Sequence, residues 1–597
     1  MFRRIIENNL YYPKYYYKHI GSKLFIVVAI CLLIGVLDGL GLTMFLPLLQ
    51  VADGAMGEPL DGMGKLSVIF DLIDAAGISL TISVILIFLC IFFISKGIVV
   101  YLGNTYKIIV QQYFVKKIRL DMLHAITNIS FRAFIKSDAG RIQNTMSGEV
   151  SRLSMSLTYY LGALQNIVMV LVYLSFAILI NAKFSILVAF GGYFMSFIFK
   201  RIYNITKRES ATLTKESNLY QGLLIQFIAN FKYLRATQTV TKVENKLEGQ
   251  IYQIERNNRK LGMLASLVSA IREPSMIMVV AIAIYIEVTI IGSSLSSILV
   301  SLLFFYRALN SLLLVQTNWN SFLGVSGSME NMKDFQKNID FHREDFGSIN
   351  LSKFSKSLKL ENSIMSYDQT QVINNISLEI KKNESVAFVG ESGSGKTTLL
   401  NVLSGLLPLS GGIYKIDDID IKEYDVRSLQ RKVGYITQEP VIFSSTIFEN
   451  ITCWSEKTEE TMKRFNSIIK KASLLDFISS CDLKEDTVLG NNGINLSGGQ
   501  RQRISIAREL YKDVEILIMD EATSALDSET ERAIQKSIDS LKGQYTMIIV
   551  AHRLSTIKFV DNIFVIKNGN IIEEGNYEEL MQSNSAVFKK MVNLQVL

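Results

Sequence analysis

The sequence is poor in cysteine and in charge. Its 597 residues include only four cysteines, and none of them forms a Cys-x-x-Cys pair. Neither a disulfide framework nor a zinc cluster is therefore expected. Charged residues make up 20% of the chain and hydrophobic residues 49%, a balance that excludes intrinsic disorder and is unusual for a wholly soluble protein. We expect one half of the chain to lie in a membrane and the other half to be soluble.

Apolar residues are concentrated in the first part of the chain. Helices cross a bilayer with about 20 mostly apolar residues, and six runs fit this length. They lie at 24–49, 78–102, 161–181, 184–200, 274–292 and 295–317. The residues before the first run are basic and aromatic, and the run is far longer than the apolar core of a signal peptide, so no cleaved signal is expected. The tyrosines of residues 1–23 predict a segment on the membrane surface, with a disordered tail as the alternative.

The charges between the apolar runs predict the orientation. The first loop is acidic, whereas the long segments after the second and fourth runs are rich in Lys and Arg. Positive charge favours the cytoplasmic side, so both termini are expected there. The long segments predict helices that project into the cytosol and turn near residues 134–141 and 221–235. Residues 65–76 predict an amphipathic helix, either on the outer membrane surface or merely capping its loop. The basic residues form no block, so the net charge of +7 does not predict a nucleic-acid partner.

Apart from Lys200, the last residue of its run, four ionisable residues fall inside the apolar runs, where charge is costly and often functional. Asp38 and Arg307 lie near the middle of their runs. Each could line a polar path for a substrate or form a structural ion pair. Lys96 is expected to extend toward the cytoplasmic interface, and Glu287 lies in the outer half of its run.

From about residue 356 the pattern changes to short apolar strands that alternate with helices, which predicts an α/β domain. An apolar strand at 385–389 is followed directly by a glycine-rich segment and a helix. This is the context of a phosphate-binding loop, in which Lys396 neutralises phosphates and Thr397 binds Mg²⁺. Its residues are Gly390, Glu391, Ser392, Gly393, Ser394, Gly395, Lys396, Thr397 and Thr398.

Two further segments carry chemistry. The apolar strand at 516–521 ends in Asp520, a predicted Mg²⁺ ligand, and Glu521, which would act as the base or orient the attacking water. A second anion site is predicted where a Ser-Gly-Gly opening precedes the helix at 501–510. Its residues are Leu496, Ser497, Gly498, Gly499 and Gln500.

This combination resembles the nucleotide-binding domain of the ATP-binding cassette (ABC) transporters, in which Leu-Ser-Gly-Gly-Gln is the defining signature. The resemblance implies that Tyr367 stacks on adenine and that Gln438 joins Mg²⁺ to the membrane helices. It also implies that residues 524–527, ending in Asp527, form the D-loop and that His552 is the switch histidine. Lys396, Glu521 and His552 would be the catalytic residues, with ATP and Mg²⁺ as cofactors.

Six spans followed by one cassette resemble the half-size exporters, which implies a homodimer or a pairing with a related half-transporter. The expected fold is a polytopic α-helical membrane domain followed by an α/β P-loop ATPase domain. Its expected segments are an interfacial segment at 1–23, the membrane domain at 24–340, a linker at 341–355 and the nucleotide-binding domain at 356–597.

The run at 35–47 and the Asn-Gly before the signature resemble those of the bacterial lipid-linked oligosaccharide flippases and related glycolipid exporters. This implies ATP-driven flipping of a lipid-linked or other amphipathic substrate across the bacterial inner membrane, with membrane lipid as a partner. A multidrug or small-peptide exporter is the alternative, and an ATP-gated regulatory subunit is a further one. Asn491 and Asn492 replace charged residues found in many exporters, which puts the usual ionic contacts of that segment in doubt.

Overall fold

The structure is a computed structural model that describes most of the chain. The described residues are 12–45, 47–48, 81–137, 139–180, 182–286, 289, 295–341, 344, 346–490, 493–520, 535, 538–551, 557–582 and 586–596. The chain divides into two compact units, one of residues 1–129 and 133–343 and the other of residues 130–132 and 344–597. The predicted outer-loop helix at 65–76 lies outside the described residues.

The first unit is helical. Its principal helices are α2 (Lys23–Thr43), α5 (Ile82–Thr127), α8 (Val150–Ile180), α9 (Ala182–Ala229), α11 (Val240–Ile286), α12 (Leu295–Val325) and α13 (Gly327–Phe341). With 46 residues, α5 is about 69 Å long, more than twice the ~30 Å hydrocarbon core of a bilayer. The expectation of helices that project well beyond the membrane is thus confirmed by α5, and α9 and α11 have similar lengths.

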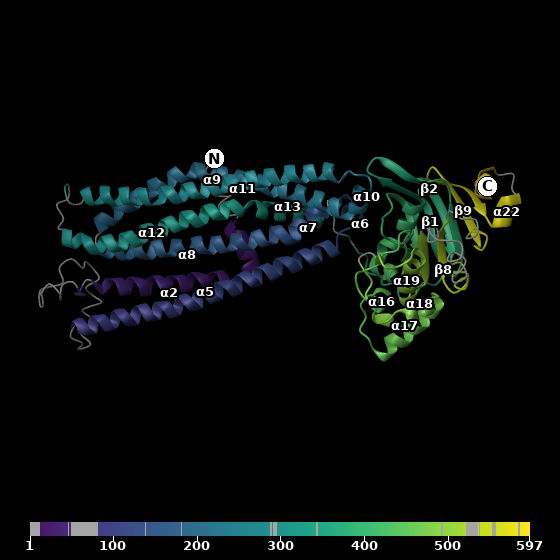
Figure 1. Cartoon of the computed structure of the whole chain (residues 1–597), viewed down its shortest axis with the longest axis horizontal. Helices are drawn as coiled ribbons and strands as arrows, with labels where there is room; N and C mark the ends of the chain where they lie inside the picture. Colours follow the sequence, from purple (N-terminus) through teal and green to yellow (C-terminus); the bar gives the residue numbers. More distant parts are fainter. Residues whose placement is uncertain are drawn as a thin grey trace. The chain divides into compact units, whose positions relative to one another are not determined.

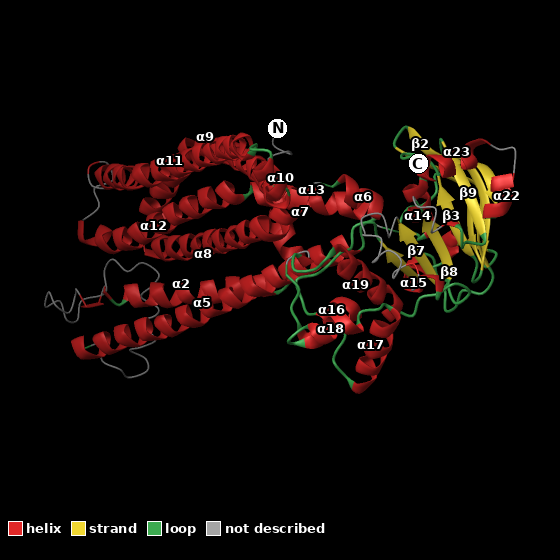
Figure 2. Cartoon of the chain, turned by 45° about the vertical axis from the view of Figure 1, so that its right-hand side comes forward, coloured by secondary structure: helices red, strands yellow, loops and turns green. Residues whose placement is uncertain are grey.

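Four described segments are long and apolar enough to cross a membrane, namely α2, α5, Gly140–Leu179 and α11. The predicted spans at 184–200 and 295–317 fall within α9 and α12, where part of the side chains is not described. Helices α2 and α5 lie side by side, and α8 packs against α12 and α9 against α11 (Figures 1 and 2). The short helices α6 (Phe131–Lys136) and α10 (Phe231–Ala236) lie at the two turns between long helices.

The first predicted span contains an interruption that the sequence did not predict. Helix α2 ends at Thr43, whereas the apolar run continues to residue 49. Residues 45, 47 and 48 are helical again, so the helix is interrupted at Met44. Pro47 fits an interruption there, because it has no N–H to donate to the carbonyl of Thr43.

The N-terminal segment packs three of its tyrosines against protein, a contact that the sequence did not predict. Its position along the membrane surface stays a prediction. Residues 12–20 are helical, and Tyr12, Tyr15 and Tyr16 are buried. Tyr16 stacks on Tyr160 and shares a 2.7 Å hydrogen bond with Ser156, both in α8. Spacings of three and four residues place these rings on one helix face, and that face packs into the bundle.

The second unit contains two sheets. The antiparallel sheet has the order β2-β1-β4-β5, and the six-stranded sheet has the order β10-β9-β3-β8-β7-β6. The antiparallel strands are β1 (Ser357–Tyr367), β2 (Thr370–Lys381), β4 (Gly411–Ile416) and β5 (Ile419–Asp420). The strands of the larger sheet are β3 (Ser385–Val389), β6 (Val433–Ile436), β7 (Ile516–Asp520), β8 (Thr546–Val550), β9 (Asn562–Lys567) and β10 (Asn570–Gly575).

The six-stranded sheet separates two apolar cores. Along β3, Ala387 and Val389 face one core while Val386 and Phe388 face the other, as the two-residue repeat of a strand requires. Helix α14 (Lys396–Leu403) follows β3, and α16 (Ile447–Thr452), α17 (Glu459–Lys471), α18 (Leu475–Ser480) and α19 (Gly498–Tyr511) form a helical group (Figure 2). Strands β3, β7 and β8 are buried along their whole length. A buried parallel sheet of this kind is rigid and can hold side chains at its edge.

Candidate functional site

The phosphate-binding loop, residues 390–398, connects β3 to α14. Gly395 caps α14 with a φ of +104°, a conformation that glycine adopts without steric cost. A Cβ on Gly390 would lie 2.2 Å from the carbonyl oxygen of Ile566, so only glycine fits there. The two glycines let the loop turn tightly at the N-terminus of a helix, where N–H groups attract anions.

The lysine of this loop is buried together with a serine hydroxyl. Lys396 is only 6% exposed, and its Nζ donates to the carbonyl oxygens of Gly390 and Glu391 at 2.9 and 2.8 Å. Ser394 Oγ, in a residue that is also 6% exposed, has no hydrogen-bond partner among the described residues. Thr397, next along α14, is exposed. A buried cation beside a buried hydroxyl suits a phosphate group, so the residues present fit a nucleotide.

Strand pairing brings three other segments to the same edge of the sheet. Val550 pairs with both Phe388 and Asp520, and Ile436 pairs with Met519. The strands are parallel, so the ends of β3, β8, β7 and β6 lie side by side, with neighbours about 4.8 Å apart. Asp520, at the end of β7, and Gln438, two residues after β6, therefore share this edge with the phosphate-binding loop.

Asp520 acts electrostatically on a tyrosine of the neighbouring strand. Burial, and after it the negative charge of Asp520, raises the pKa of Tyr435 above its ordinary value. The Tyr435 hydroxyl donates to Asn401 Oδ1 in α14 at 3.3 Å. The carboxylate predicted to bind Mg²⁺ is thus in a partly desolvated position beside the first turns of α14.

Three predicted residues of this site fall in stretches that the structure does not describe. Glu521, Asp527 and His552 lie outside the described residues, as do Asn491 and Asn492. The chain ahead of two of them is described, because β7 ends at Asp520 and β8 is followed by Ala551. Their roles stay predictions.

Tyr367 ends β1 at the hairpin to β2, where it pairs with Thr370. Its side chain is half-buried. In the same hairpin, the carbonyl oxygen of Val372 lies 3.0 Å from where a Cβ on Gly395 would stand. The hairpin therefore approaches the phosphate-binding loop. The stacking of Tyr367 on adenine stays a prediction.

The signature segment, residues 496–500, opens α19 as the sequence predicted. Ser497 is the N-cap: its Oγ accepts from Gln500 N at 3.2 Å, and Gln500 Oε1 accepts from Ser497 N at 2.8 Å. This capping box uses one lone pair of the hydroxyl and fixes the helix start. Ser497 is exposed, so its hydroxyl proton is accessible to an anion.

Sequence reasoning missed a buried arginine further along α19. Arg508 is 6% exposed and donates to the backbone oxygens of Asn450 and Val441 at 2.6 and 2.7 Å. Its position could have been noticed, because it lies four residues after Ile504 on the apolar face of a predicted helix. A charge on such a face needs buried partners.

In the first unit the structure pairs Asp38 with Lys96. Asp38 is 1% exposed, and one of its carboxylate oxygens forms an ion pair with Lys96 Nζ in α5 while the other accepts from the hydroxyl of Tyr173 in α8. The expectation that Lys96 extends toward the interface is therefore wrong, because a buried carboxylate draws the ammonium to itself. Asp38 could line a polar path for a substrate or form a structural ion pair, and in the structure it forms the ion pair.

Arg307 lies in α12 and is half-buried. Its guanidinium acts electrostatically on the Tyr173 hydroxyl, which links it to the Asp38 cluster. No carboxylate among the described residues forms an ion pair with Arg307. Glu287, the fourth intramembrane ionisable residue, lies outside the described residues.

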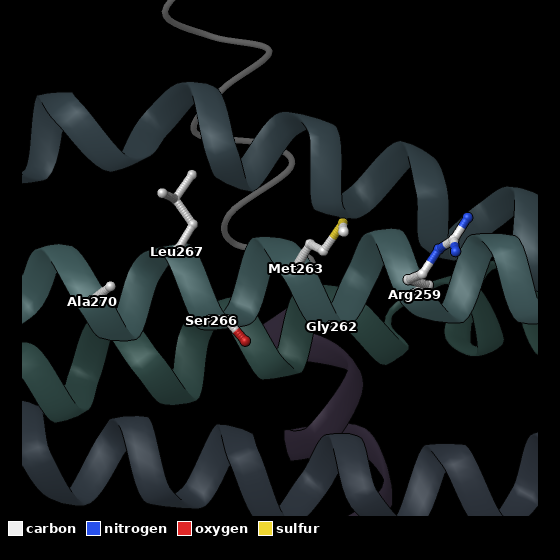
Figure 3. A pocket seen from close by; sticks show the side chains of 6 residues that line it. All are labelled: Arg259, Gly262, Met263, Ser266, Leu267 and Ala270. Atoms are coloured by element: carbon white, nitrogen blue, oxygen red, sulfur yellow. The ribbon is translucent and has the colours of Figure 1, made fainter.

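A pocket with a volume of about 610 Å³ lies along α11 (Figure 3). Its lining residues are Arg259, Gly262, Met263, Ser266, Leu267 and Ala270. All of them belong to one helix, so the pocket is a surface groove and holds none of the predicted site residues.

Comparison with known families matches both units. Residues 64–316 match the ABC transporter transmembrane region, and residues 373–524 match the ABC transporter family. The two matches follow each other in the order that the sequence predicted, with the membrane region first.

Individual proteins give the same result. An ATP-dependent lipid A-core flippase of Sodalis glossinidius is 34% identical over 366 residues, which are 59% of this chain and 61% of the flippase. The matched region thus spans about three fifths of that relative. The heterocyst differentiation ATP-binding protein of a Nostoc species is 28% identical over 82% of this chain and 80% of its own length. A solved structure described as a bacterial Atm1-family ABC exporter with ATP bound superposes with a TM-score of 0.79 at 21% identity, covering 97% of this chain and all of that one.

Proposed function

Because the chain belongs to the ABC transporter family, we propose that it hydrolyses ATP to flip an amphipathic glycolipid across the membrane that it spans. The observation that carries the ATP-dependent part is the common edge of the six-stranded sheet. The phosphate-binding loop, Asp520 and Gln438 follow or end the parallel strands β3, β7 and β6, whose carboxyl ends share this edge. A nucleotide bound at this edge would reach all three.

The residues of this edge have distinct tasks. Lys396 would exchange its carbonyl partners for the phosphates, and the loop N–H groups and Ser394 Oγ would hydrogen-bond the same oxygens. Tyr367 would stack on the base. Glu521 would orient the attacking water, and His552 would hold the γ-phosphate, as the family resemblance implies.

Magnesium fits the oxygen ligands at this edge. Thr397, Asp520 and Gln438 offer a hydroxyl, a carboxylate and an amide oxygen, the hard ligands that Mg²⁺ prefers. When bound, the ion would neutralise negative charge on the phosphates.

The chain contains one signature segment and one phosphate-binding loop. We infer a dimer, either of two copies or with a related half-transporter, in which the Ser497 segment of one chain, with Asp527, completes the ATP site of the other. The exposed Ser497 hydroxyl and helix N-terminus support this assignment.

The proposed cargo is a lipid-linked oligosaccharide or a related glycolipid. The relative named above is described as a lipid A-core flippase, which supports a lipid cargo. In this chain, Asp38 neutralises Lys96, whereas Arg307 has no such partner among the described residues. Arg307 would therefore meet an anionic head group, and Asp38 would shape the path by holding Lys96. The membrane would be the bacterial inner membrane, with both termini cytoplasmic.

The test is ATPase activity of the purified chain in nanodiscs, alongside Glu521→Gln. Polyprenyl-pyrophosphate-linked sugars and a panel of drugs would be added in parallel. Stimulation by the lipid-linked sugars, abolished in Glu521→Gln, is expected. Stimulation by drugs alone would favour a multidrug exporter and contradict the proposed glycolipid cargo. Absence of ATP hydrolysis would contradict the proposed ATPase activity.

The role of Arg307 has a separate test. Head-group translocation should slow in Arg307→Ala while basal ATPase activity stays intact, because the residue lies far along the chain from the nucleotide site. A translocation rate equal to that of the unaltered protein would remove Arg307 from the path.

A further inference from the structure

Two consecutive residues near the end of α19 hold the segment that carries Gln438. Arg508 binds the chain after Gln438, through the carbonyl of Val441. Glu509 binds the strand before it, because its Oε2 accepts from Tyr435 N at 3.2 Å. The signature helix is therefore attached to both sides of Gln438.

Asn450 completes the attachment on the far side. Its Nδ2 donates to the carbonyl oxygens of Phe443, Ser445 and Thr446, at 2.9, 3.4 and 3.0 Å. Its Oδ1 accepts from Phe443 N at 2.9 Å and from Arg508 Nη2 at 2.9 Å. Asn450 is fully buried, so the turn at 441–446 is fixed to both α16 and Arg508.

The chemistry of Arg508 is unusual for a buried charge. Its three acceptors among the described residues are uncharged oxygens, on Val441 and Asn450. Its guanidinium lies over the Phe443 ring, 5.0 Å from the centroid. Burying a cation without a carboxylate is costly. Burial lowers the pKa of Arg508, yet a guanidinium stays protonated in proteins. Burying the guanidinium lowers the stability of the fold, but its planar group holds three acceptors in a fixed geometry.

We propose that Arg508 and Asn450 are positioning residues that make the Gln438 segment and the signature helix one rigid piece. This inference rests on the proposed ATPase function. Ser497 lies about 16–17 Å along α19 from Arg508, at 1.5 Å per residue, and the same helix fixes its position. Movement of Gln438 on nucleotide binding is then transmitted directly to the signature segment that closes over the partner's nucleotide.

The variants separate positioning from general stability. Arg508→Lys keeps the charge but cannot reach three acceptors in one plane. Asn450→Asp keeps an oxygen for Arg508 while removing the donors that hold residues 443–446. Arg503→Lys is the matched control, because Arg503 lies on the same helix and donates to the carbonyl of Ser473 at 2.9 Å, away from Gln438.

The measurement is turnover per bound nucleotide in the full chain in nanodiscs. Binding of mant-ATP with Mg²⁺ gives affinity and stoichiometry, and phosphate release gives kcat. We expect unchanged affinity and about a tenfold fall in kcat per bound nucleotide in both variants, with no further fall in the double variant. Unfolding alone would lower stoichiometry and activity together and leave turnover per bound nucleotide unchanged.

Two outcomes would overturn the inference. One is a turnover per bound nucleotide in Arg508→Lys equal to that of Arg503→Lys. The other is a turnover per bound nucleotide in Asn450→Asp equal to that of the unaltered protein. This second outcome tests the inference even if Arg508→Lys fails to fold. Absence of hydrolysis in the unaltered protein would instead overturn the proposed function.

Discussion

The two units bury charge in different ways. In the ATP-binding unit, Lys396 and Arg508 donate chiefly to backbone carbonyl groups. In the membrane unit, Asp38 is satisfied by side chains of two other helices, Lys96 and Tyr173. Backbone partners belong to the fold and cannot be removed by substitution, whereas side-chain partners can be exchanged as a pair. The membrane unit should therefore tolerate the loss of a whole ion pair better than the loss of one member.

The largest expected effect comes from breaking that ion pair. Lys96→Met would leave the Asp38 carboxylate, 1% exposed, with only the Tyr173 hydroxyl. Removing one partner of a buried pair costs about 3–5 kcal/mol, while replacing both is close to neutral. The unfolding temperature in nanodiscs should therefore fall in Lys96→Met and recover in the double variant with Asp38→Asn. A double variant no more stable than Lys96→Met would show that the pair does not organise α2 and α5.

The features that the sequence predicts correctly are those set by neighbouring residues. The strand before the phosphate-binding loop was predicted at 385–389 and is β3 at Ser385–Val389. The helix predicted at 501–510 is α19, Gly498–Tyr511. Both depend on neighbouring residues: an apolar strand, a glycine turn and a capping box. Local signals of this kind are complete within a short window.

The contacts that the sequence did not predict join distant residues. Asp38 and Lys96 are 58 residues apart, and so are Asn450 and Arg508. The sequence shows where each charged residue lies, but the residue that it contacts depends on which helices pack together. The buried tyrosines at 12, 15 and 16 have the same cause: their spacing predicts one helix face, but the bundle determines what that face meets.

A smaller effect is expected from the N-terminal helix as the pH falls. Burial lowers the pKa of His19 from 6.5 to about 4, with the positive charges of Lys117 and Lys18 adding to the shift. Because the folded-state pKa lies below the unfolded one, the unfolded state binds the proton first. Stability is therefore retained above pH 6.5 and lost as the pH falls from 6.5 to 4, by up to about 3 kcal/mol.

The measurement is the unfolding temperature between pH 4 and pH 7 for His19→Phe. Carboxylates also titrate in this range. The effect of His19 is therefore taken from the difference in unfolding temperature between the variant and the unaltered protein at each pH. His124→Gln is the control, because His124 is exposed in α5. His19→Phe should lose part of the acid sensitivity, and His124→Gln should keep it. Equal acid sensitivity in all three proteins would mean that His19 accepts a proton in the folded state at no cost.

The smallest effect is expected at an ion pair between α9 and α13 of the same bundle. Lys207 Nζ lies 3.0 Å from Glu330 Oε1, and their side chains are 37% and 48% exposed. Burial lowers the pKa of Lys207, but the bonds to Glu330 and Tyr12 outweigh it and hold the pKa above its usual value. Exposed pairs contribute about 0–1 kcal/mol, and salt screens them. Lys207→Met should therefore shift the unfolding temperature slightly at low salt and hardly at all at high salt. Each of the two ion pairs joins two helices, but the Lys207–Glu330 pair is far more exposed to water. If Lys207→Met lowered the unfolding temperature as much as Lys96→Met, exposure to water would not determine how much an ion pair contributes to stability.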